Sequence, residues 1–258
     1  IEGDFAYLST GFGVIAFDII KKEISETFNL GAGGTFLQVN ECCISNDTIY
    51  AACEDGIYSG SLKSNLIDFQ NWIKMSNLPE GNYNTIVALN DKVVCNFQIE
   101  GESDKDTVYV LESGTWGKKS LGSNYKNENV LDLNENGTEI IATLNGHVRI
   151  VDENLMESSR IWEYAGTNFT PAPQEAIRDG NDFWIADRDA ALVHYYNGGL
   201  NVDIVIPSGP AFSDSWRLDY SDGHLWTTTG TLTTSMKISF NNKGIANFSD
   251  EKWTSYFG

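Results

Sequence analysis

The chain has 258 residues, 41% hydrophobic and 12% aromatic, which is enough to bury a core along its whole length and excludes an intrinsically disordered protein. Its 36 acidic residues against 17 Lys and Arg give a formal net charge of −19, so we expect no binding to nucleic acid. No run approaches the roughly 20 apolar residues of a membrane span, so we expect no membrane insertion.

The sequence contains an internal repeat. A large apolar residue recurs at intervals of 43, 44, 47, 43 and 42 residues, at Tyr7, Tyr50, Val94, Ile141, Trp184 and Trp226. A second set runs in step with the first, at Phe28, Trp72, Trp116, Trp162, Val205 and Trp253. A glycine begins a further segment of the repeat at Gly13, Gly56 and Gly146. Such a period is typical of repeat proteins with one supersecondary unit per repeat.

Each repeat consists of short β-rich runs separated by turn residues, which predicts strands. The repeat around Tyr50 shows four of them, VNECCI, TIYAAC, IYSGSL and NWIKM, with SND and EDG as turns between the first three. In chain order we expect the second strands of successive repeats at 5–9, 49–53, 92–97, 139–144, 182–187 and 224–229. The large apolar residues of the second set mark the fourth, outer strands. Helix should be minimal.

The predicted fold is all-β, a β-propeller of four-stranded antiparallel blades with about six blades present. Before Tyr7 there is no room for an innermost strand, so the first blade should have three strands and five complete blades should follow. We therefore expect residues 1–258 to form a single propeller domain that is truncated at its N-terminus.

The sequence predicts no cofactor and no metal site. The four cysteines, Cys42, Cys43, Cys53 and Cys95, do not have the spacing of zinc ligands, and the three histidines are distant from them in sequence. Small buried hydrophobic side chains are the interpretation we adopt. Cys42 and Cys43 are adjacent and should point to opposite faces of their strand.

We expect no enzymatic activity. No G-x-S-x-G motif is present, so the sequence does not indicate a serine hydrolase. A propeller glycoside hydrolase or lyase is the lowest-ranked of three functional hypotheses. Such an enzyme would have two or three acids converging on a water-filled channel. Sequence alone cannot select such acids from the 36 that are present.

A candidate binding face is predicted at the hairpins between second and third strands, which share one face of a propeller with the connections between blades. It comprises the 98–105 loop together with Glu54, Asp55, Asp187, Arg188 and Asp189. The alternative for each of these hairpins is an ordinary solvated turn.

Trp216 and Arg217 are candidates for the channel lining. Both belong to the segment SWRLDYS, which we expect to be an innermost strand. Burial in the core is the commoner role for such a tryptophan.

Several phrases carry a resemblance to a known family, among them YLSTGFGVIAFDI, DTVYVLESGTW, WIADRDAALVHYYNGG and VIPSGPAFSDSWRLDYSDGHLW. In this order they resemble the N-terminal propeller of PorZ-type proteins of Bacteroidetes, which are surface components of the type IX secretion system and are often described as two-component-regulator propellers. The resemblance implies a seven-bladed ring, with two blades before this chain and a second propeller after it. ADRDAAL departs from the family, which more often has a glycine before the leucine.

The resemblance implies a non-catalytic binding or scaffold protein of the cell-envelope secretion and surface-attachment machinery. It would be exported to the periplasm or the outer-membrane cell surface. Its partners would be proteins of the outer-membrane complex, with surface polysaccharide as a further ligand. The alternative is a periplasmic propeller that senses a glycan for a hybrid two-component regulator. The sequence that follows Gly258 in the gene would distinguish the two.

Overall fold

The computed structural model describes residues 1–99, 101–102, 105–122, 129–205, 208–212, 214–239 and 243–257. Residues 100, 103 and 104 of the predicted 98–105 loop lie outside the described residues. Two compact units, Ile1–Val205 and Ile206–Gly258, are present, and each is described by itself. Described helical structure is confined to three short 3₁₀ turns, η1 (Ala32–Gly34), η2 (Phe69–Asn71) and η3 (Asn197–Gly199).

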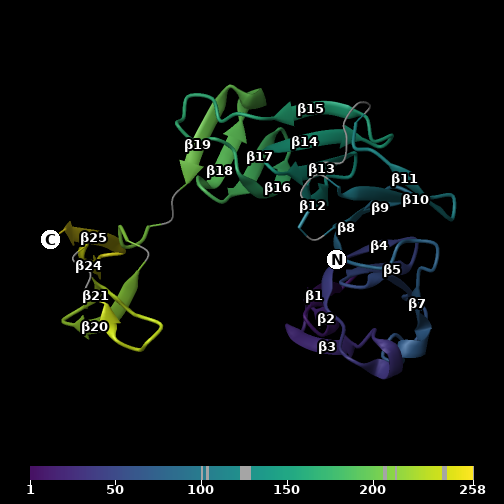
Figure 1. Ribbon diagram of the computed structural model, residues 1–258, viewed down its shortest axis with the longest axis horizontal. Coiled ribbons are helices and arrows are strands. Elements are labelled where there is room, and N and C mark those ends of the chain that lie inside the picture. Colours follow the sequence, from purple (N-terminus) through teal and green to yellow (C-terminus); the bar gives the residue numbers. More distant parts are fainter. Residues whose placement is uncertain are drawn as a thin grey trace. The chain divides into compact units, whose positions relative to one another are not determined.

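The first unit contains five antiparallel sheets, which we call blades 1 to 5 (Figure 1). Blade 1 has three strands, β1 (Phe5–Thr10), β2 (Gly13–Asp18) and β3 (Glu23–Phe28). Blade 2 has β4 (Val39–Ser45), β5 (Thr48–Cys53), β6 (Gly56–Ser61) and β7 (Trp72–Lys74). Blade 3 has β8 (Tyr83–Leu89), β9 (Lys92–Phe97), β10 (Thr107–Glu112) and β11 (Thr115–Lys119). Blade 4 has β12 (Val130–Glu135), β13 (Glu139–Leu144), β14 (His147–Asp152) and β15 (Glu157–Ile161). Blade 5 has β16 (Pro173–Asp179), β17 (Asp182–Asp187), β18 (Ala191–Tyr196) and β19 (Asn201–Val205).

The second unit contains blade 6. Its strands are β20 (Ser215–Ser221), β21 (His224–Thr229), β24 (Gly244–Ser249) and β25 (Lys252–Phe257), paired in this order. A two-stranded hairpin, β22 (Thr231–Leu232) and β23 (Ile238–Ser239), is inserted between β21 and β24. Each four-stranded sheet follows chain order from first to fourth strand, which confirms the all-β propeller prediction and the three-stranded first blade.

The repeat is confirmed at the level of single residues. Tyr50, Val94, Ile141, Trp184 and Trp226 all lie on second strands. Each pairs with the residue at the equivalent position of its first strand, namely Cys43, Val87, Asn134, Ile177 and Asp219. The period therefore reports one backbone unit that is used repeatedly.

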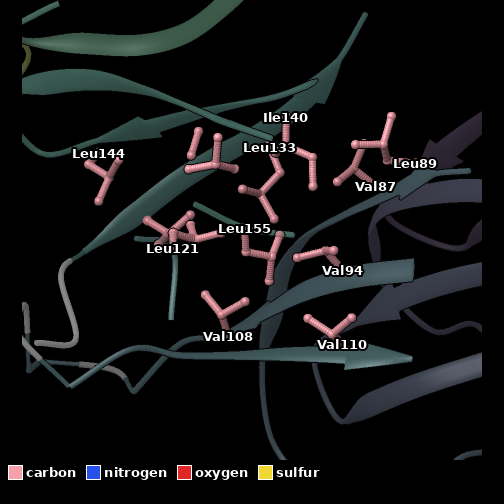
Figure 2. Packing of buried hydrophobic residues seen from close by; sticks show 13 residues of the cluster. Val87, Leu89, Val94, Val108, Val110, Leu121, Leu133, Ile140, Leu144 and Leu155 are labelled. Atoms are coloured by element: carbon pink, nitrogen blue, oxygen red, sulfur yellow. The ribbon is translucent and has the colours of Figure 1, made fainter. Parts of the chain in front are cut away.

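The hydrophobic core of the first unit lies between blades rather than within one. Four clusters of buried apolar side chains occupy the interfaces of blades 1 and 2, 2 and 3, 3 and 4, and 4 and 5. Figure 2 shows the third of these, where Val94, Val108 and Val110 of blade 3 face Leu133 and Ile140 of blade 4. The innermost described strands of neighbouring blades also pack against each other, β1 on β4, β4 on β8, β8 on β12 and β12 on β16.

Three of the four outer tryptophans lie on fourth strands as predicted, namely Trp72, Trp116 and Trp253. Trp72 and Trp116 lie on fourth strands, are 6% and 9% exposed, and pack between neighbouring blades. Trp162 does not, because β15 ends at Ile161 and the indole is 65% exposed. Successive side chains of a strand point to opposite faces, and Ile161 takes the buried position. Trp162 therefore does not mark the fourth strand of its blade, and that part of the prediction was wrong.

Two kinds of residue fix the turns and the blade edges. Asn46 and Asp47 connect β4 to β5 with φ of 49° and 56°, which is the left-handed geometry of a two-residue hairpin turn. Gly13 begins β2 with φ of 146°, and a Cβ there would lie 2.0 Å from the carbonyl oxygen of Phe28 on β3. Glycine is required at this position both for its backbone angle and for the close approach of the outer strand.

The extent of the ring stays a prediction. A single propeller domain over residues 1–258, truncated at its N-terminus and belonging to a seven-bladed ring, is expected from the sequence and the resemblance. In the first unit, strand β1 forms its ladder with β2, and in the described residues its other edge carries only the isolated bridge between Phe5 and Glu2.

Candidate functional site on the inner strands

The hairpin between β5 and β6 carries Glu54 and Asp55. Glu54 is exposed, whereas Asp55 is half-buried and engaged. Its Oδ2 accepts hydrogen bonds from the Tyr58 hydroxyl at 3.0 Å and from Lys74 Nζ at 3.1 Å. Burial and this carboxylate raise the pKa of Tyr58. Asp55 thus holds β6 and β7 together at the tip, and Glu54 is the member of the pair that is free to meet a partner.

The hairpin between β17 and β18 differs from the expectation that all three of its charged residues project. Asp187 is 6% exposed and accepts four hydrogen bonds. Burial acts to raise the pKa of Asp187, but hydrogen bonds from the Ala190 and Ala172 N–H groups and the Tyr164 hydroxyl hold it below its usual value. Arg188 and Asp189 are exposed and form an ion pair at 3.1 Å. No hydrogen bond or ion pair between described residues joins this tip to Glu54 or Asp55.

Trp216 and Arg217 lie on β20, the first strand of blade 6. Trp216 is 36% exposed within its unit and so is not a buried core residue there. The Arg217 guanidinium lies 5.8 Å from the centre of the Trp216 ring, a cation–π contact. Arg217 occupies a special position in its strand, because the β20 to β21 pairing shifts register between Ser215 and Arg217.

The same register shift occurs in every complete blade, and sequence reasoning missed it. The pairing of first and second strands shifts immediately before Glu41, Thr85, Asp132, Glu175 and Arg217. A β-bulge of this kind turns a side chain away from the regular alternation and is common beside functional sites. A sequence signal was available, since each of these residues stands nine positions before a second-strand marker. The position is polar throughout, which a core position would not be.

The bulges of blades 2 and 3 connect each blade to the next one. Glu41 Oε2 accepts hydrogen bonds from Thr85 Oγ1 at 2.5 Å and from the Ile86 N–H at 2.8 Å, both on β8. Thr85 Oγ1 in turn accepts the Leu133 N–H of β12 at 3.0 Å. The asparagine that precedes Glu41 adds a further link, because Asn40 Nδ2 donates to the Tyr83 carbonyl of β8 at 2.8 Å. Three consecutive inner strands are therefore linked by side chains.

Asn84 repeats the role of Asn40 one blade later. Its Nδ2 donates to Val130 O at 2.8 Å and to Leu131 O at 3.1 Å, both on β12. The bulge pairs of blades 2 and 3 thus present one amide donor and one oxygen acceptor to the backbone of the following blade.

Acidic groups dominate the electrostatics of the inner strands. Burial raises the pKa of Glu41 to about 7, with further contributions from the negative charges of Asp132 and Glu175. Burial and the Glu175 charge raise the pKa of Asp132 to about 6, although Asn134 Nδ2 donates to its carboxylate at 2.6 Å. Glu41 also lines a cavity of about 390 Å³, bordered by β1, β4, β8 and β12 and by Ile1 and Glu2.

The arrangement fits a structural role for Glu41 better than a catalytic one. A glycosidase pair needs two carboxyl groups that are open to the sugar. One Glu41 oxygen is occupied by two donors of the next blade. Among the described residues no group of three or more His, Cys, Asp or Glu side chains could hold a metal ion. The four cysteines are free thiols, and Cys42 and Cys43 pack in different core clusters.

Comparison with known proteins gives the relationship. Residues 1–73 match the family model of the PorZ N-terminal β-propeller domain of the type IX secretion system. PorZ from Porphyromonas gingivalis, described as an essential bacterial surface component of that system, has a similar fold with a TM-score of 0.68 and 18% identity. The similarity covers 100% of this chain and 32% of the PorZ chain, so the chain spans about a third of that protein. The PorZ resemblance of the sequence is thereby confirmed.

Two further solved structures share the fold. The extracellular domain of the putative one-component system BT4673 from B. thetaiotaomicron matches 100% of this chain and 40% of its own, with a TM-score of 0.54 and 12% identity. YCF48 bound to D1 peptide matches 97% of this chain and 78% of its own, with a TM-score of 0.52 and 11% identity. At such identities these similarities show the fold alone. No curated protein sequence matches the chain.

The described part of the chain contains no helix long and apolar enough to cross a membrane. The PorZ and BT4673 structures are of a surface component and an extracellular domain, respectively.

Proposed function

We propose that this chain is a non-catalytic binding propeller of the cell-surface machinery for type IX secretion and attachment. The observation that carries the proposal is the PorZ relationship, in which the family match at residues 1–73 and the fold similarity over the whole chain agree. Export to the periplasm or cell surface and protein partners in the outer-membrane complex are parts of the same proposal. Surface polysaccharide is a further candidate ligand.

The hairpin tips supply the proposed contact residues. Of the residues expected there, Glu54, Arg188 and Asp189 are exposed. Asp55 and Asp187 instead stabilise the hairpins that present them. Rigid hairpins with exposed charged tips are suited to recognising a protein partner, because charge complementarity gives specificity and fast association.

The test uses the bacterium that carries the gene. Deletion of the segment for residues 1–258 should remove type IX cargo from the cell surface and leave it inside the envelope. Cargo is measured by surface labelling, and the remainder of the protein by immunoblot. Normal surface cargo in the presence of a stable truncated protein would contradict the proposal.

Single charge reversals test the binding face separately. Glu54→Lys and Asp189→Lys should reduce surface cargo, whereas Glu23→Lys makes the same charge change on the exposed outer strand β3 and should not. If all three variants behave like the wild-type protein, the face is wrong while the scaffold role is still testable by the deletion.

A sensor role is the second candidate, and the fold similarity to the BT4673 extracellular domain favours it. In that case a ligand on one face of the propeller would alter signalling across the membrane. The sequence that follows Gly258 in the gene distinguishes the two functions. A membrane helix and a kinase or DNA-binding domain would indicate the sensor, and a second propeller with a small β-domain would indicate the secretion scaffold.

A further inference from the structure

Glu41 is placed where three blades meet. It belongs to β4, and its Oε2 accepts from Thr85 Oγ1 and the Ile86 N–H of β8. Thr85 Oγ1 accepts from the Leu133 N–H of β12, so the hydrogen-bond path continues into the third blade. A carboxyl oxygen can accept both bonds whether the group is ionised or protonated, because the proton can reside on Oε1.

The charges that reach Glu41 from the surrounding elements are acidic. Asp132 on β12 and Glu175 on β16 both act on it, and Glu175 acts on Asp132 as well. The cavity beside it is also lined by Glu2, Tyr7, Glu135 and the adjoining Cys42 and Cys43.

No lysine, arginine or histidine side chain is among the described residues of that lining. Burial raises the pKa of the adjoining Cys42 thiol. Around Glu41 itself, ionisation therefore adds a negative charge to a site that already contains two.

We propose that Glu41 joins blades 2, 3 and 4 most stably in its protonated form, so that the inner edge of the propeller loosens when this carboxyl group ionises. Ionisation strengthens the two hydrogen bonds that Oε2 accepts. It also places a negative charge in a site that is shielded from water and lies near the negative charges of Asp132 and Glu175. Only two donors face the ionised group, whereas the adjoining cavity is lined by Glu2 and Glu135 and by no cationic side chain among its described residues, so the second effect is the larger one. The raised pKa of Glu41 agrees with this balance.

The direction of the pH dependence follows from the pKa values. Glu41 has a folded-state pKa of about 7 against an ordinary value of 4.5, and Asp132 about 6 against 3.8. A carboxyl group with a raised folded-state pKa contributes stability that is complete below its ordinary pKa and is lost as the pH rises through the folded-state value. The propeller should therefore lose stability between about pH 4 and pH 7, where most proteins do not.

The test is the unfolding equilibrium of the chain in urea between pH 4.5 and pH 8, with Glu41→Gln as the main variant. Glutamine keeps an oxygen that can accept both hydrogen bonds and cannot ionise. We expect the folding equilibrium constant of the wild-type protein to fall on the order of 100-fold more than that of Glu41→Gln over this range. Glu23→Gln on the exposed strand β3 is the matched control and should follow the wild-type curve.

A second variant keeps the proposal falsifiable if Glu41→Gln does not fold. Glu175 is exposed and acts on Glu41 through its charge, so Glu175→Gln should fold and should shift the loss of stability to lower pH. A carbon-13 NMR titration of the Glu41 carboxyl group gives the pKa of this group directly. A Glu41 carboxyl that titrates near its ordinary value, or pH curves that are identical in Glu175→Gln and wild type, would overturn the proposal.

Discussion

Replacement of Asp187 by asparagine tests whether this carboxylate maintains the β17 to β18 hairpin. Its Oδ1 accepts from the N–H groups of Asp189 at 2.9 Å and Ala190 at 2.8 Å. Its Oδ2 accepts from the Ala172 N–H at 2.7 Å and the Tyr164 hydroxyl at 2.8 Å. Asparagine has one acceptor oxygen, and even with its NH₂ group turned toward Tyr164, whose hydroxyl can also accept, the Ala172 N–H is left facing a donor.

The magnitude follows from the one buried donor that loses its acceptor. A buried donor left without an acceptor costs roughly 1–3 kcal/mol, so Asp187→Asn should lower the free energy of unfolding by about 2 kcal/mol. For a domain of this size that corresponds to a melting temperature lower by about 4–8 °C. Tyr164→Phe removes one donor and one of the four bonds, and it should lower the free energy of unfolding by about 1 kcal/mol.

The assay is urea unfolding and thermal melting at pH 7, with Asp189→Asn as the matched control. Asp189 is exposed and its ion pair with Arg188 is a surface pair, so this change should alter the free energy of unfolding by less than about 1 kcal/mol. The lowered pKa of Asp187 means that its stabilisation is present above its ordinary pKa and is lost as the pH falls through the lowered value. The difference between Asp187→Asn and wild type should therefore shrink in strong acid. Equal effects of Asp187→Asn and Asp189→Asn at pH 7 would refute the structural role.

Three further outcomes follow from the fold. Trp116→Ala should lower the free energy of unfolding by about 3–5 kcal/mol in urea titrations, whereas Trp162→Ala should change it by less than about 0.5 kcal/mol because that indole is exposed. Gly13→Ala should lower the melting temperature clearly and Gly11→Ala should not, since a Cβ at Gly13 meets the Phe28 carbonyl while one at Gly11 meets nothing within 4 Å. We expect the isolated chain to form an open ring that self-associates through an unpaired inner edge, measurable by analytical ultracentrifugation. A crystal structure with blades 1 and 6 packed directly on each other would contradict that expectation and indicate a six-bladed ring.

The repeat was predictable because it depends on local information. Alternating apolar residues and turn residues such as Asn46 and Asp47 define strands and hairpins within a few positions. Trp162 shows the limit of that information, since the sequence offers two adjacent large apolar residues and does not say which one faces the core. The pairing of β14 with β15 is irregular between Ile150 and Val151, and a shift of one residue decides whether Ile161 or Trp162 faces the core.

The candidate site was less predictable because its properties depend on residues distant in sequence. Asp187 belongs to a charged segment typical of a solvated turn, yet it is buried by Tyr164 and Ala172, which precede it by 23 and 15 positions. Glu41 depends on Thr85, 44 positions later, and on the negative charges of two further blades. A period in the sequence locates such positions, but their pKa values come only from the assembled inner strands.

The bulge at the start of each first strand keeps the same backbone geometry whichever side chain follows it. The blades keep one register shift while the residue that follows it is glutamate, threonine, aspartate, glutamate or arginine. The apolar clusters between blades lie elsewhere, so an exchange at this position leaves them intact, although at Glu41 and Thr85 it also removes hydrogen bonds to the next blade. A gene that grows by duplication of blades can therefore diversify the chemistry of its inner strands one codon at a time, and a protein engineer has five equivalent positions at which to do the same.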